Sequence, residues 1–180
     1  MKTRGRWLIT AILLLLAAAP FAAARAAEPI KRPRYIAVVG FKNLRPGTDA
    51  DWIGEGAAET ITTKLCGVPG LVAVERREIK KVIMEQDFQQ SDLVDPKAAV
   101  VVGRLVGAER IVIGTHVSDG EGVLFNVRVV DVRTAVVLNA ASVTGAKRGL
   151  FELLFRLAEA VIESFNKRVV FVDDRPLVAE

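Results

Sequence analysis

Three apolar segments of strand length follow one another in the second half of the chain, at residues 110–117, 123–130 and 136–144. Links of only a few residues separate them, which is the spacing of strands joined by hairpins. In the middle segment, apolar side chains occupy every second position, at Phe125, Val127 and Val129. One face of the segment is therefore expected to be buried. The sequence predicts an antiparallel meander of three strands.

A strand and a helix are predicted near the start of the domain. The apolar run Tyr35–Phe41 has the length and composition of an internal strand. Thr48 or Asp49 can cap a helix that extends to about Cys66, and the turn at 67–70 ends it. Apolar residues recur at every fourth position of this helix, at Ile53, Ala57, Ile61 and Leu65.

Two further helices are predicted between these elements and the meander. A short strand at 71–75 leads into a charged helix at 76–86. Asp95-Pro96 predicts the beginning of another helix, because proline is favoured at the first helical position, and Gly107 predicts its end. The valines at 100–102 are also typical of a strand, so this alternative stays open.

The strongest helical pattern is the last one, at residues 150–165. Its apolar positions form one face, made by Leu150, Leu154, Leu157, Val161 and Phe165. The complete order of elements is β-α-β-α-α-β-β-β-α. This order predicts one domain of the α/β (α+β) class, with helices packed on a mixed sheet.

The N-terminus has the pattern of a secretory signal peptide. Three basic residues precede a nearly uncharged apolar run at 7–19, which is followed by an alanine-rich stretch. Ala24-Arg25-Ala26 predicts cleavage before Ala27, and Ala22–Ala24 offers a competing site. We therefore expect a cleavable leader at residues 1–26 and a periplasmic location.

Removal of this leader changes the charge of the protein. The whole chain has 25 Lys and Arg against 21 Asp and Glu, and four of the basic residues lie in the acid-free leader. The mature chain is then neutral, which argues against a nucleic-acid partner.

The mature chain divides into a linker at 27–34, one domain at 35–168 and a tail at 169–180. We expect no transmembrane segment in it.

The chain offers few side chains that perform chemistry. His116 is its only histidine and Cys66 its only cysteine, and neither has an evident catalytic partner. A zinc site needs three or four nitrogen or sulfur ligands, which these two residues cannot supply. We therefore expect no catalytic residue, no metal site and no cofactor. His116 is expected to have a hydrogen-bonded or solvent-facing structural role. Cys66 is expected to be buried as a small apolar residue, and an intermolecular disulfide is the alternative.

A glycine pattern in the first predicted helix was tested as a nucleotide site. Gly54-x-Gly56-x-x-Glu59 is superficially similar to a dinucleotide fingerprint, but it lies inside a helix and lacks the third glycine. Close packing of a neighbouring backbone is the better interpretation. The charged helix at 76–86 is expected to face solvent or protein rather than lipid.

The segment Leu71–Gly114 resembles the curli secretion channel family, the CsgG-like proteins of bacterial envelopes. The residues that carry the resemblance are Val74-Glu75-Arg76, Glu85-Gln86, 91–95, Gly107-Ala108 and Gly114-Thr115. Segments 127–138 and 36–43 are similar to other strands of that family. Asp51–Gly56, together with Val68–Leu71, is similar to related periplasmic domains of the TolB N-terminal and FlgO type.

The resemblance implies a fold like the anticodon-binding domain and a non-enzymatic role in envelope assembly or secretion. It does not imply a pore. The turn at 120–122 and the link near Gly145 are too short for membrane hairpins, since one membrane strand needs about 9–11 residues. The chain also lacks a cysteine near the cleavage site, where a lipoprotein would carry its lipid anchor.

We therefore expect a soluble periplasmic accessory or scaffold protein that acts through contacts with envelope proteins. Formation of a homo-oligomer and peripheral association with the outer membrane are both compatible with this expectation. The candidate contact residues are Lys42, Asn43, Leu44 and Arg45 after the first strand, and Arg76, Arg77 and Lys80 in the charged helix. Two alternatives stay open. One is a reduced channel subunit that associates with pore-forming paralogues, and the other is a ligand-sensing or cell-wall-synthase-regulating module.

Overall fold

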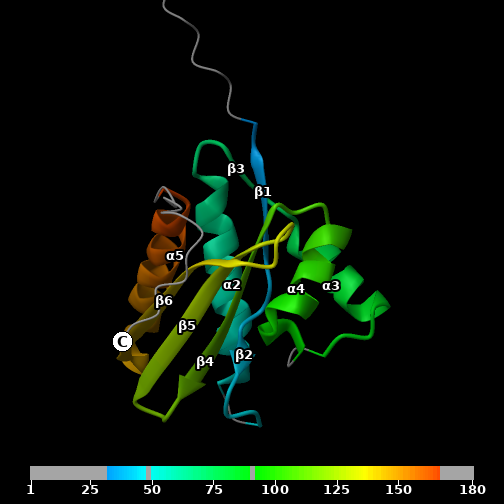
Figure 1. Ribbon diagram of the computed structural model, residues 1–180. Helices are drawn as coiled ribbons and strands as arrows, with labels where there is room; N and C mark the ends of the chain where they lie inside the picture. The colour runs from blue at the N-terminus through cyan, green and yellow to red at the C-terminus, as the bar shows by residue number, and fades with distance from the viewer. Residues whose placement is uncertain (1–31, 48–49, 90–91, 167–180) are drawn as a thin grey trace, which may run out of the picture. The chain divides into compact units, whose positions relative to one another are not determined.

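The predicted mixed sheet is present in the computed structural model, which describes residues 32–47, 50–89 and 92–166. Within these residues, six strands form one sheet in the order β3-β1-β4-β5-β6, and β2 pairs with β4 (Figure 1). Strands β1, β2 and β3 make only parallel pairs, whereas β4, β5 and β6 form an antiparallel meander. The bounds are β1 Arg34–Val38, β2 Lys42–Asn43, β3 Leu71–Ala73, β4 Arg110–Ser118, β5 Gly122–Asp131 and β6 Val137–Ala146.

Four α-helices cover the sheet within the described residues, two on each face (Figure 1). Helices α2 (Asp51–Cys66) and α5 (Leu150–Asn166) share one hydrophobic core with the inward residues of β1 and β5. Helices α3 (Arg76–Glu85) and α4 (Pro96–Leu105) share a second core on the opposite face. This arrangement confirms the predicted fold class. None of the described helices is long and apolar enough to cross a membrane.

Local signals in the sequence were reliable for the helices. The predicted apolar faces of α2 and α5 are buried. Residues 96–105 form a helix rather than a strand, and the Asp95 carboxylate caps it by accepting a hydrogen bond from the Lys97 amide at 3.0 Å. Gly107 follows α4 with a positive φ of 69°. Helix α2 begins after Ala50, which makes no side-chain cap, while the predicted caps Thr48 and Asp49 lie outside the described residues.

Two local predictions were wrong. The first strand ends at Val38 rather than Phe41, and residues 39–41 form an irregular link before the short strand β2, which pairs with β4 in the same parallel direction. Cys66 is exposed rather than buried. The buried stripe of α2 passes through Leu65, and the next residue is rotated by about 100° away from it. The predicted leader, linker start and C-terminal tail lie at residues outside the described ranges, so these boundaries stay predictions.

Gly54 of α2 packs against the backbone of the link between β1 and β2. A Cβ atom at this position would lie 2.0 Å from the Phe41 carbonyl oxygen and 3.0 Å from Cε1 of His116. The Phe41 amide also donates a hydrogen bond to the Gly54 carbonyl at 3.3 Å. Packing is therefore the role of Gly54, as predicted. At Gly56, by contrast, a Cβ atom would meet nothing within 4 Å.

Replacing these two glycines by alanine should have opposite effects. Gly54→Ala is expected to lower the free energy of unfolding by about 1–3 kcal/mol, because the new methyl group overlaps the Phe41 backbone. Gly56→Ala is expected to raise it by about 1 kcal/mol, since alanine is the better helix former. Urea unfolding of both variants measures the two changes. Equal effects at the two positions would contradict the close approach.

Candidate functional site

A crevice lies at the carboxyl ends of β1 and β3. The chain leaves β1 toward α2 on one face of the sheet and leaves β3 toward α3 on the other. Adjacent parallel strands whose connections leave toward opposite faces open a gap between their loops, where ligands of α/β proteins bind. The structure places the candidate site in this gap.

The crevice has a volume of about 250 Å³ and a largely apolar lining. Residues Val38–Gly40 of the strand end form one wall, and α3 forms another with Ile79, Ile83 and Met84. Leu93 closes the crevice from the segment before α4. The charged side chains in the lining are Glu55, Arg76 and Lys80.

Arg76 connects the two sides of this crevice. Its guanidinium group pairs with Glu55 at 2.5 Å and with Glu59 at 3.2 Å, both on α2. It also donates a hydrogen bond to the Val38 carbonyl at 3.3 Å. The side chain is only 11% exposed. A planar guanidinium can satisfy several acceptors at once, so Arg76 holds α2, α3 and the end of β1 together.

Glu55 lies between two cations. The Lys80 ammonium group approaches its carboxylate at 2.8 Å, in addition to the contact with Arg76. Burial alone would raise the pKa of Glu55, but the hydrogen bond from Lys80 and the charges of Arg76 and Lys80 outweigh burial and lower the pKa below its ordinary value. Glu55 is therefore ionised near neutral pH and neutralises charge inside the crevice.

A second, shallower hollow adjoins the crevice at Glu55. It measures about 470 Å³ and is lined by residues of the segment after β1, including Phe41, Lys42, Asn43 and Pro46. The Asn43 side chain fixes this segment: its Nδ2 donates to Asp51 at 2.5 Å, and its Oδ1 accepts from the Arg45 amide at 2.9 Å. The loop is thus attached to the first turn of α2.

The structure brings the two predicted groups of contact residues to one end of the sheet. Lys42 and Asn43 line the hollow, while Arg76 and Lys80 line the crevice. Arg77 is 86% exposed beside the crevice, and Leu44 and Arg45 are exposed on the loop. Arg76 differs from the others, because its ion pairs are internal and its guanidinium is turned away from solvent.

Sequence reasoning missed the apolar part of the site. Ile83, Met84 and Leu93 line the crevice, and Met84 is 79% exposed. Nothing in the local pattern distinguishes these residues from an ordinary helix face. The order β-α-β-α could have indicated the gap, because the connections that follow two adjacent parallel strands can leave toward opposite faces of the sheet.

His116 holds the backbone just before α2 in place. The residue is completely buried in β4, and its Nε2 lies 3.1 Å from the Ala50 carbonyl. A carbonyl only accepts, so Nε2 carries the proton. Burial lowers the pKa of His116, and the carbonyl of Ala50, the charge of Asp51 and the carbonyl of Phe41 offset this only in part. The predicted hydrogen-bonded structural role is the one observed.

The comparisons with known proteins identify the family. The sequence model of the FlgO protein family matches residues 19–148, which is more than half of the chain. The chain belongs to the FlgO protein family. The predicted similarity to the FlgO type is thereby confirmed, whereas the similarity to the curli secretion channel stays a prediction. No curated sequence matches the chain.

Solved structures share the fold of this FlgO-family chain at low sequence identity. The C-terminal domain of LpoB from Escherichia coli is 15% identical, with a TM-score of 0.52 over 67% of this chain and 88% of that domain. The same domain from Salmonella enterica is 16% identical, with a TM-score of 0.51 over 67% and 86%. Lipoprotein GNA1162 from Neisseria meningitidis is 19% identical, with a TM-score of 0.51 over 74% and 99%.

Within the part of the chain that the structure describes, no group of three or more histidine, cysteine or acidic side chains is placed to hold a metal ion. The crevice itself offers an apolar surface and two internal ion pairs, with exposed basic side chains beside them.

Arg76→Lys should destabilise the protein by about 1–3 kcal/mol. A lysine cannot reach Glu55, Glu59 and the Val38 carbonyl at once, so two or more charge-assisted hydrogen bonds are lost. The neighbouring change Arg77→Lys is the control and should stay within about 0.5 kcal/mol of the parent, because Arg77 is exposed. Chemical denaturation compares the two. An unchanged midpoint for Arg76→Lys would show that the contacts contribute nothing.

His116 should make the fold less stable in mild acid. Its folded-state pKa lies below the ordinary 6.5, so the stability it contributes is complete above pH 6.5 and declines as the pH falls below it. The variant His116→Gln should lose this dependence between pH 7 and 5. Because His116 is the only histidine, one imidazole resonance reports its pKa directly by NMR. A pKa at or above 6.5 would contradict the prediction.

Proposed function

We propose that this FlgO-family protein is a non-enzymatic, exported accessory protein of the cell envelope that binds another envelope protein through the crevice at the ends of β1 and β3. The observation that carries the proposal is the crevice itself, an apolar recess with exposed basic side chains beside it. Its acidic residue is already neutralised from within by Arg76 and Lys80.

The size of the crevice favours a protein segment over a small molecule. Ligand pockets usually measure about 300–1,000 Å³ and enclose most of the ligand, whereas this recess has about 250 Å³. It can accept one apolar side chain of a partner. Met84 adds an adaptable apolar rim of the kind that protein interfaces use.

The surroundings define the charge of that partner. Lys42 lies in the adjoining hollow, Arg45 on the same loop and Arg77 on the exposed side of α3. A partner segment with an apolar anchor flanked by acidic residues is complementary to this surface. Such complementarity contributes specificity and association rate more than affinity.

The location is supported by the predicted leader at residues 1–26 and by the fold. One of the solved structures that share this fold is described as a lipoprotein. We infer a periplasmic protein that reaches the outer membrane only through its partner. The finer hypotheses are a part in curli assembly or secretion, a reduced channel subunit, and a ligand-sensing or cell-wall-synthase-regulating module. Release by osmotic shock is expected here, whereas a channel subunit would remain in the outer-membrane pellet.

Site-specific photo-crosslinking in cells tests the proposed surface. A crosslinking residue at Met84 should capture a partner, whereas one at Phe151 should not, although the two side chains are equally exposed at 79% and 77%. Phe151 lies on α5, which packs in the other core. Equal capture from both positions, or none from Met84, would disprove the site.

Charge reversal then tests the basic surroundings. The double variant Lys42→Glu and Arg77→Glu should reduce capture from Met84 at least tenfold, because it repels an acidic partner. Arg148→Glu is the matched control, since Arg148 is exposed on the short helix before α5. Lys80 is left intact, because its reversal would also break the contact with Glu55.

A further inference from the structure

Strand β6 is one edge of the sheet that the described residues form. It extends over ten residues and pairs with β5 along one side, and no other described strand pairs with it. The opposite edge strand, β3, has only three residues. A long unpaired edge presents a row of backbone donors and acceptors that can template another strand.

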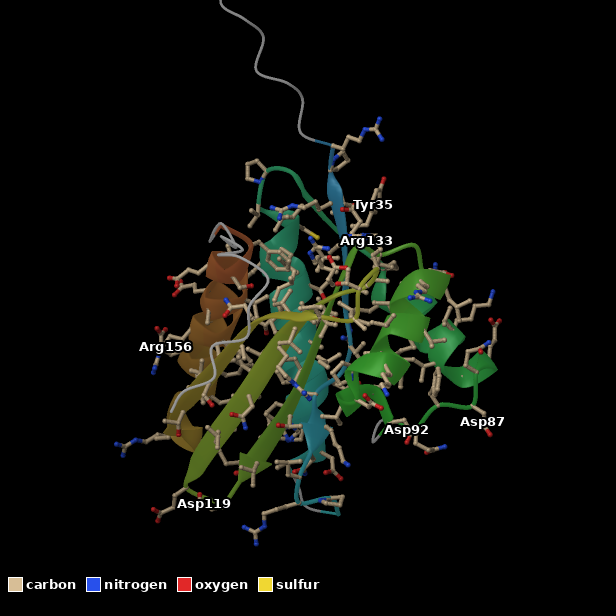
Figure 2. All side chains as sticks on the ribbon, viewed as in Figure 1. Tyr35, Asp87, Asp92, Asp119, Arg133 and Arg156 are labelled. Carbon is tan, nitrogen blue, oxygen red and sulfur yellow. The ribbon has the colours of Figure 1, made fainter. Side chains whose placement is uncertain are left out.

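The usual protections of an edge are sparse in β6. Its sequence VLNAASVTGA contains no charged residue and no proline. Charges lie in the turns at either end of the meander instead, as Asp119 and Arg133 show (Figure 2). A register shift opposite Val129 and Val130 interrupts only the beginning of the strand. Residues 139–146 therefore form a regular, uncharged edge.

The hydrogen bonds of the β5–β6 ladder determine which backbone groups of β6 face outward. The Lys147 amide donates to the Glu121 carbonyl at 2.7 Å, in register with the β5–β6 ladder. Bonded and non-bonded pairs alternate in an antiparallel ladder, so Val143 and Gly145 bond to β5. Ser142 and Thr144 then direct their amide and carbonyl groups to the open edge.

We propose that this edge pairs with β6 of a second copy of the chain, in antiparallel orientation, to form a twofold dimer with a continuous sheet. When a strand pairs with its own copy, each residue lies opposite the same residue of the other copy or one close to it in sequence. A charged residue near the twofold axis would therefore face a like charge. β6 has none. With the twofold axis at Val143, Ser142 of each copy lies opposite Thr144 of the other, and Ser–Thr pairs stabilise antiparallel strands.

The C-terminal tail is a poor occupant of the same edge. β1 and β6 run in the same direction, and α2 and α5 lie on the same face of the sheet. The crossover β1-α2-β3 moves toward one edge, whereas a strand placed outside β6 after α5 would move toward the other. The second crossover would therefore have the opposite hand to the first. Parallel crossovers are almost always right-handed, so the tail is disfavoured there.

Proline at Ser142 tests the dimer without disturbing the monomer. Ser142→Pro removes an amide that faces the open edge and leaves the ladder with β5 intact. Ser142→Ala is the control, because it removes the same hydroxyl contacts to Asn126 and Phe125 but keeps the amide. Light scattering of the full-length chain, purified as the cell produces it, should show the mass doubling between about 1 μM and about 1 mM for the parent and for Ser142→Ala. Ser142→Pro should remain a monomer.

A parent protein that is monomeric up to about 1 mM would overturn the proposal, and so would a Ser142→Pro variant that still dimerises. An assembly larger than two would also overturn it, because twofold edge pairing closes at a dimer. These outcomes are independent of the proposed function, since the crevice lies at β1 and β3 rather than at β6.

Amide hydrogen exchange separates a second copy from the tail. The Ser142 and Thr144 amides should be protected at high concentration and should exchange at least tenfold faster on dilution to the monomer. The Val143 amide should be protected under both conditions, because it bonds to β5. Protection of Ser142 and Thr144 that persists in the monomer would instead indicate that the tail covers the edge, and rapid exchange throughout would indicate an empty edge.

Discussion

The contact between the beginning of α2 and the link that follows β1 determines the arrangement of the candidate site. Gly54 approaches the Phe41 backbone so closely that no side chain fits between them. One residue further along α2, Glu55 reaches Arg76 and Lys80 on α3. The same first turn holds the loop after β1 through Asp51 and Asn43. His116 fixes the chain just before it through Ala50. The crevice thus depends on a backbone approach that only glycine allows.

This arrangement divides the polar groups of the site between structure and recognition. Arg76, Glu55 and Asn43 are occupied by contacts inside the molecule, so they shape the crevice but contribute little direct attraction for a partner. Arg77 and Met84 remain turned toward solvent. The basic side chains and the apolar rim are therefore the groups that a partner would meet. A preorganised recess of this kind lowers the entropy lost on binding, because its walls do not have to be ordered first.

Local chemistry made most of the fold predictable, and long-range contacts limited the rest. Asp95-Pro96 gave the beginning of α4, and hairpin spacing gave the meander, because both depend on neighbours in sequence. The candidate contact residues at 42–45 and 76–80 were found separately, but their convergence depends on packing between elements. Arg76 was expected to face a partner. Its ion pairs with Glu55 and Glu59 join residues 17–21 positions apart in sequence, and nothing in the local pattern indicates these contacts. Cys66 was misplaced for a related reason: one residue at a helix end decides between the buried stripe and solvent.

The open edge and the crevice occupy different parts of one sheet, and this separation has a consequence for assembly. Three strands, β1, β4 and β5, lie between β3 and β6. A dimer formed through β6 therefore leaves both crevices uncovered, at the two distant edges of the joined sheet. Some partners present several copies of the same binding segment. Two identical surfaces on one rigid body bind such a partner far more tightly than one surface does, because the second contact is intramolecular. The same geometry gives no such gain with a partner present as a single copy. An accessory protein built in this way would discriminate by the spacing of its partners as well as by their sequence.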